Sequence, residues 1–77
     1  MACINADGTL TRSGELIILA LRTPSTPEEV AQETGEALFK VRSALREFMG
    51  VGFVEAEENK YRCTPEALER LEGSPAG

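Results

Sequence analysis

The sequence contains no histidine and no tryptophan, and its aromatic residues are limited to three phenylalanines and one tyrosine. Histidine is a common general base and the commonest metal ligand in proteins. No serine or cysteine stands beside a plausible base, no glycine-rich loop is placed to hold a phosphate, and 77 residues leave little room for a deep pocket. The sequence therefore predicts that the protein is not an enzyme and uses no cofactor or small-molecule ligand.

Cysteine is also rare. Cys3 lies near the N-terminus and Cys63 in an expected strand, and neither has the CxxC spacing of a metal site. We interpret both as reduced thiols, with a redox pair as the less favoured alternative. Glu55, Glu57 and Glu58 alternate faces or occupy an exposed turn, which is a poor arrangement for a metal ion. We expect no bound metal.

Long hydrophobic runs are missing as well. The longest, residues 16–21, falls far short of the ~20 residues that a membrane-spanning helix requires, and no charged and then apolar leader opens the sequence. These features predict a cytoplasmic protein with no membrane contact. A single domain of this size has a core worth only about 3–5 kcal/mol, so a homodimer would add stability.

The N-terminal part predicts one helix after an irregular start. Residues 1–10 have neither helical nor strand periodicity, and we expect a flexible N-terminal segment there. A first helix begins near Thr11 or Ser13, with Ser13 as a reasonable N-cap, and its apolar run at 16–21 predicts the buried centre of the fold. It should stop at Arg22-Thr23-Pro24, because the residue before proline avoids the helical conformation.

The start of the second helix is the strongest local signal in the sequence. Thr26 is a cap, Pro27 suits the first helical position, and Glu29 completes a capping box. Gly35 should end this short helix, because glycine accepts the left-handed backbone of a tight exit. We expect the inner side of the helix to carry Val30, Ala31 and Thr34.

Residues 36–49 predict a long amphipathic third helix. Its apolar stripe is formed by Leu38, Val41, Leu45 and Phe48. Two strands, 53–57 and 60–64, should follow as a hairpin that turns at Glu58 and Asn59. The expected inward positions of the hairpin are Val54, Ala56, Tyr61 and Cys63.

A fourth helix should start at Thr64-Pro65, which repeats the threonine and proline of the second helix start. It carries Leu68 and Leu71. The apolar face of the first helix, with these two leucines and the residues around Leu10, is the expected dimer contact. Residues 74–77 should form a frayed tail.

Two segments carry a resemblance to a known family. In "TPEEVAQETGEALFKVRSAL", a small residue, Ala31, stands four residues before the turn glycine Gly35. In "LREFMGVGFVEAEENKYRCTPEAL", a Leu-x-x-Phe pair precedes a glycine and two apolar residues, and the hairpin returns as Tyr-Arg-x-Thr. This pattern resembles the winged helix-turn-helix transcription regulators of the broad ArsR and MarR type, over about residues 11–73.

The resemblance implies a fold class and a function. The expected fold is mainly α with a small β-hairpin (α+β): a winged helix-turn-helix domain at 11–73, with a three-helix core, a wing and a C-terminal helix. The expected function is transcription regulation by DNA binding, with the third helix in the major groove. DNA-binding members usually have a basic wing, whereas this one begins with Glu55, Glu57 and Glu58.

Basic residues gather around the third helix. Five of the eight lie between residues 36 and 62, where five acids balance them, and the rest of the chain carries the net charge of −5. At 100° per residue, the third helix turns Phe39, Ser43 and Arg46 away from its apolar stripe. Arginine pairs with guanine edges, lysine with phosphate, and serine with either. The predicted contacts to double-stranded DNA are Phe39, Lys40, Arg42, Ser43, Arg46, Lys60 and Arg62.

Several alternatives stay open at this stage. The helix charges are also compatible with an ordinary solvated face. Phe39 could contact a thymine methyl group, anchor a protein partner, or belong to the core if the helix is rotated. The glutamates of the hairpin could pair across the strands with Lys60 and Arg62. The alternative function is an acidic winged-helix module that binds a protein partner and no DNA.

Overall fold

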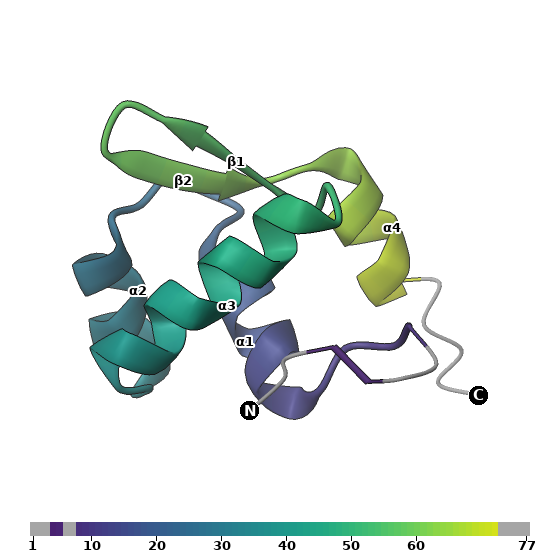
Figure 1. Ribbon diagram of the computed structural model, residues 1–77, viewed down its shortest axis with the longest axis horizontal. Coiled ribbons are helices and arrows are strands. Elements are labelled where there is room, and N and C mark those ends of the chain that lie inside the picture. The colour runs from purple at the N-terminus through teal and green to yellow at the C-terminus, as the bar shows by residue number, and fades with distance from the viewer. Residues whose placement is uncertain (1–3, 6–7, 73–77) are drawn as a thin grey trace.

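The computed structural model describes residues 4–5 and 8–72. It is mainly α with one small hairpin, as the sequence predicts (Figure 1). The elements in chain order are α1 (Arg12–Ala20), α2 (Pro27–Thr34), α3 (Leu38–Gly50), β1 (Val54–Glu57), β2 (Lys60–Cys63) and α4 (Pro65–Glu72). The hairpin lies along one side of the α1–α3 group, and α4 lies beyond the C-terminal end of α3 (Figure 1).

Helix α1 is central to the core. It contacts α2, α3, β2 and α4, and Ile17, Ile18 and Leu21 are fully buried. Its apolar run does not lie wholly inside, however, because Leu16 and Leu19 are 36% and 46% exposed. The other buried apolar residues of the core are Val30, Val41, Ala44, Leu45, Phe48, Phe53, Val54 and Ala67.

The expected cap of α1 is wrong by two residues. Thr11, not Ser13, is the N-cap, and its hydroxyl accepts a hydrogen bond from the Gly14 N–H at 3.1 Å. The hydroxyl of Ser13 instead donates to Glu36, more than twenty residues away in the sequence. Such a tertiary partner cannot be identified from the local pattern of caps.

Helix α1 also ends before the predicted stop. Ala20 is its last residue, and the N–H of Leu21 donates to Ile17 and Ile18. The chain then turns so that Ser25 and Tyr61 exchange two backbone hydrogen bonds, of 2.9 and 2.8 Å. The connection to the hairpin, rather than Pro24 alone, therefore determines the path of this segment.

Helix α2 forms as its sequence signals predict. The Glu29 N–H donates to the Thr26 hydroxyl, and the Thr26 N–H donates to the Glu29 carboxylate, so both halves of the capping box are present. Gly35 ends the helix in the left-handed conformation, with φ 78°. Val30 is fully buried, while Ala31 and Thr34 are half-buried.

Helix α3 begins at Leu38 rather than at residue 36, and it ends at Gly50. Residues 35–37 form the turn because the Glu36 N–H donates to the Thr34 hydroxyl, which in turn donates to the Val30 carbonyl. The predicted apolar stripe faces the core, with Leu38 half-buried at its start.

The hairpin turns at Glu58 and Asn59, as predicted. Glu57 pairs with Lys60 on either side of the turn, and Glu58 has a positive φ of 57°. The inward assignment of Ala56 is wrong, because that residue is exposed. Only the base of the hairpin, at Val54, packs fully against the core, while the tip extends beyond it.

Helix α4 starts at Pro65, as predicted. The Thr64 hydroxyl accepts from the Ala67 N–H and donates to the Gly52 carbonyl at 2.8 Å, which ties α4 to the end of α3. At the other end of the chain, Ile4 and Leu10 form a bridge and pack against the core. The proposed flexible segment 1–10 lies partly, and the tail 74–77 wholly, outside the described residues, so these boundaries stay predictions.

Candidate nucleic-acid interface

The outward face of α3 carries three neighbouring side chains. Phe39, Ser43 and Arg46 are all exposed, Phe39 by 76%. Their spacing of four and three residues places them on one side of the helix, over about 10 Å along its axis. We call these three residues the central stripe. The exposure of Phe39 excludes the alternative in which it belongs to the core.

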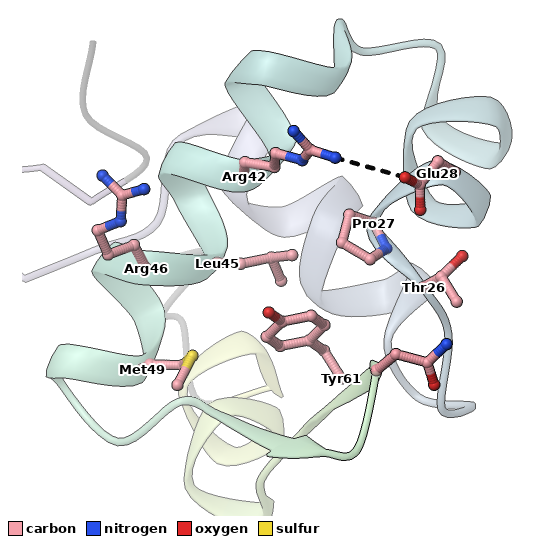
Figure 2. A pocket seen from close by; sticks show the side chains of 9 residues that line it. Thr26, Pro27, Glu28, Arg42, Leu45, Arg46, Met49 and Tyr61 are labelled. Carbon is pink, nitrogen blue, oxygen red and sulfur yellow. Dashed lines mark hydrogen bonds and ion pairs between the residues drawn. The ribbon is translucent and has the colours of Figure 1, made fainter.

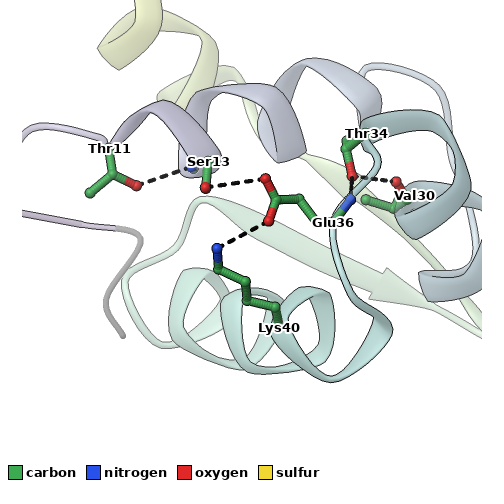
Figure 3. A network of polar contacts seen from close by, with 7 residues as sticks. Thr11, Ser13, Val30, Thr34, Glu36 and Lys40 are labelled. Atoms are coloured by element: carbon green, nitrogen blue, oxygen red, sulfur yellow. Dashed lines mark hydrogen bonds and ion pairs between the residues drawn. The ribbon is translucent and has the colours of Figure 1, made fainter.

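Two basic side chains flank the central stripe, and both are already paired. The Arg42 guanidinium lies 3.4 Å from the Glu28 carboxylate on α2 (Figure 2). The Lys40 ammonium lies 3.1 Å from the Glu36 carboxylate (Figure 3). Within residues 4–5 and 8–72, by contrast, no ion pair or hydrogen bond of the Arg46 side chain is found.

The pair between Arg42 and Glu28 is weak and open to water. Both side chains are more than half exposed, and such surface pairs contribute at most about 1 kcal/mol to stability. Arg42 points toward α2, whereas Arg46 points away from it (Figure 2). An incoming anion could therefore displace Glu28 from Arg42 at little cost, and could reach Arg46 directly.

A more protected network holds the start of α3. Glu36 accepts a hydrogen bond from the Ser13 hydroxyl at 3.2 Å and pairs with Lys40 through its other oxygen (Figure 3). Because both side chains of the ion pair are largely covered, Lys40 is less available to a ligand than its sequence position indicates. Lys40 pairs with Glu36, and Glu36 connects the start of α3 with the start of α1 through Ser13.

The hairpin carries the remaining predicted contacts. Arg62 lies 3.3 Å from Glu55, directly across the two strands, which confirms the cross-strand pairing for these two residues. Lys60 lies opposite Glu57 in the register and is exposed. With Glu57 and Glu58 at its tip, the hairpin presents more negative than positive charge.

A groove of about 630 Å³ separates the start of α2 from α3 and the hairpin (Figure 2). No local pattern of residues predicts this groove, because its walls come from three separate elements. Met49 and Tyr61 add apolar surface between the two arginines and the hairpin. The residues that line the groove are Thr26, Pro27, Glu28, Arg42, Leu45, Arg46, Met49, Asn59 and Tyr61.

Other kinds of site find little support in the described part of the chain. No group of three or more histidine, cysteine, aspartate or glutamate residues there could hold a metal ion. No helix among the described residues has the length and apolar character needed to cross a membrane. Cys63 is a free thiol whose pKa is raised by burial, so it favours the protonated, less reactive form.

Comparison with known proteins defines the class of fold. The solved structure described as the crystal structure of T. acidophilum IdeR matches this chain with a TM-score of 0.59 and 23% sequence identity. Together with the four helices and the antiparallel hairpin, this similarity shows a winged-helix fold of the α+β class.

The match covers 77% of this chain but only 30% of the IdeR chain, so the protein spans less than a third of that protein's length. No family model matches the sequence, and no curated protein does. The similarity therefore concerns the fold.

Proposed function

We propose that the protein is a small DNA-binding transcription regulator that places α3 in the major groove of double-stranded DNA. The observation that carries this proposal is the central stripe, an exposed row of Phe39, Ser43 and Arg46 on the second helix of a helix-turn-helix. Helix-turn-helix domains read base edges with this helix. Assignment to regulators of the ArsR and MarR type is part of the same proposal.

The chemistry of the stripe suits base edges. Arg46 has the planar donor fork that pairs with guanine, and Ser43 can donate to or accept from several bases. Arg42 lies one turn before Arg46 and can take a phosphate in exchange for Glu28. Lys60 can reach the backbone from the hairpin, whereas Arg62 and Lys40 are engaged by glutamates.

The net negative charge of the protein limits its non-specific affinity for DNA. A net charge of −5 and an acidic hairpin tip repel phosphate, and non-specific affinity for DNA comes mainly from neutralised phosphates. We therefore expect weak affinity for arbitrary duplexes, strong dependence on salt, and a larger share of the binding energy from base contacts.

The test is a two-dimensional amide NMR titration with a mixed-sequence duplex at low salt. The amides from Thr34 to Arg46 should shift selectively, and the shifts should diminish as salt is added. Replacement of both Arg42 and Arg46 by alanine should weaken binding without unfolding the domain, because both side chains are exposed.

The matched control is the Arg12→Ala/Arg22→Ala variant, which removes the same two positive charges from exposed residues outside α3 and the hairpin. It should weaken DNA binding much less than the Arg42→Ala/Arg46→Ala variant does. Unchanged binding by the Arg42→Ala/Arg46→Ala variant would refute the proposed role of α3.

A second candidate function is an acidic winged-helix module that binds a protein partner and no DNA. The observations that favour it are the exposure of Phe39, the net charge of −5 and the acidic hairpin. This function requires a stoichiometric protein complex that is lost on Phe39→Asp, together with no DNA affinity at low salt. Detectable duplex binding through α3 would exclude it.

A further inference from the structure

Phe39 has no large apolar neighbour on its own face of α3. Its neighbours one turn away along the chain are Gly35, Glu36, Arg42 and Ser43, none of which has a large apolar side chain. The other exposed apolar residue of α3, Met49, lies about 15 Å further along the helix axis and on a different face. Protein-binding hot spots are surrounded by other contacts that exclude water, and Phe39 has no such apolar surround on its helix.

The position of Phe39 suits a base edge instead. It is the second residue of α3, and helix-turn-helix domains use the N-terminal part of this helix for base contacts. The N-cap residue of α3, Ala37, is small and exposed, so the N-cap position adds no large side chain at this end. The one apolar group that the major groove displays is the C5-methyl group of thymine.

We propose that Phe39 recognises a thymine methyl group in the major groove, an inference that rests on the proposed function. Arg46 lies two turns along the same face, about 10 Å away, which corresponds to about three base pairs at 3.4 Å each. The ligand class is therefore a duplex with a thymine about three base pairs from the guanine that Arg46 contacts. Ser43, between them, contacts the intervening step.

The experiment isolates the methyl group chemically. A duplex pool randomised at its central eight positions is selected for binding to the full chain at low salt, and the best-binding duplex is then remade with uracil at each thymine in turn. Uracil lacks only the methyl group, so base pairing is kept. Affinities are measured by fluorescence anisotropy for the unchanged protein and for Phe39→Ala, Arg46→Ala and Val51→Ala.

We expect one uracil position to weaken binding of the unchanged protein about fourfold, the equivalent of about 0.8 kcal/mol for one buried methyl group. Phe39→Ala should bind thymine and uracil duplexes equally. Arg46→Ala should bind both more weakly and keep the fourfold difference. Val51→Ala alters an exposed apolar residue just beyond the C-terminal end of α3, outside the predicted DNA contacts and the proposed dimer contact, and should behave as the unchanged protein.

The outcomes separate this inference from the proposed function. If the selected duplex is bound but no uracil position weakens it, or if Phe39→Ala keeps the discrimination, methyl recognition by Phe39 is refuted while DNA binding stands. If no duplex is enriched and Arg46→Ala changes nothing, DNA binding itself is refuted, and the inference is refuted with it.

Discussion

At the scale of single residues, Arg42 and Arg46 show how equal side chains acquire different roles. They lie one turn apart on α3, yet Arg42 is paired with Glu28 and Arg46 has no ion pair among the described residues. The difference comes from α2, whose N-terminus brings Glu28 beside Arg42 but not beside Arg46 (Figure 2). Glu28, which lies in the first turn of α2 where a negative charge is stabilising, would thus also compete with an anionic ligand for Arg42.

Replacement of Glu28 by glutamine should strengthen DNA binding. The substitution removes one negative charge from the groove and releases Arg42 for a phosphate, so we expect an increase of several-fold at low salt that shrinks as salt is added. Anisotropy titrations at two or three salt concentrations measure this effect. Glu69→Gln, an exposed glutamate on α4, makes the same change in net charge and should have a smaller effect. Equal effects of the two variants would contradict the local competition.

Cys63 should be a slow thiol at neutral pH. Burial raises its pKa, with opposing contributions from a backbone hydrogen bond and Arg22. In a Cys3→Ser background, the pH midpoint of alkylation by iodoacetamide should lie higher for the folded protein than for the protein in urea. A folded-state midpoint at or below that of the unfolded chain would contradict this prediction.

The raised pKa of Cys63 also predicts the sign of a stability change. The folded state keeps the thiol proton at pH values where the unfolded chain has lost it. The thiol's contribution to stability is therefore complete below its ordinary pKa, near 9, and is lost as pH rises through the higher folded-state pKa. A Cys63→Ala variant should lack this part of the alkaline decline.

At the scale of elements, some helix starts are stabilised by neighbouring residues in the sequence and others by tertiary contacts. The start of α2 is encoded within four residues, since Thr26 and Glu29 cap each other. The start of α3 has no side-chain cap of its own. It is held instead by Glu36, which binds Ser13 of α1 and Lys40 of α3 (Figure 3). The orientation of α3, the helix proposed to bind DNA, thus depends on α1.

Loss of the N-cap side chain of α2 should therefore lower the free energy of unfolding. Thr26→Ala removes the hydroxyl that accepts from the Glu29 N–H, and such caps typically contribute about 1 kcal/mol. Urea unfolding followed by circular dichroism should show a reduced free energy of unfolding of this size. Thr23→Ala is the control, because Thr23 is exposed and precedes the proline rather than the helix. A cost below 0.5 kcal/mol would show that the capping box is not significant in solution.

At the scale of the whole molecule, the exposed part of α1 matters most. Leu16 and Leu19 lie three residues apart and are each more than a third exposed, on the helix that otherwise forms the centre of the core. Leu10 and Leu71, which are half-buried, pack against that core. This apolar face is the proposed contact between two copies, and dimeric helix-turn-helix proteins bind DNA half-sites about 34–36 Å apart.

We accordingly expect a homodimer at high micromolar concentration. Leu19→Glu should shift the mass from dimer to monomer in light scattering, because it places a charge on the proposed contact. Val51→Glu changes a similarly exposed apolar residue at the end of α3 and should leave the dimer intact. A single-chain mass for the unchanged protein at high micromolar concentration would rule out this contact.

The sequence by itself determined the elements that depend on neighbours in the chain. The capping box at Thr26, the left-handed exit at Gly35 and the turn at Glu58 follow from side-chain and backbone preferences over a few residues, and each is found in the structure. Helical spacing was also sufficient to turn Phe39, Ser43 and Arg46 outward, since the apolar stripe of α3 fixes its rotation against the core.

Only the tertiary structure decided which of the predicted contacts are available. In the sequence, the other basic residues of this region look as available as Arg46. In the structure three of them are paired with glutamates: Lys40 with Glu36, Arg42 with Glu28 and Arg62 with Glu55. The same holds for Ser13, whose partner lies on the turn before α3, and for Ala56, which the extent of the core leaves exposed. Long-range pairing depends on where elements meet, and no local pattern of residues contains that information.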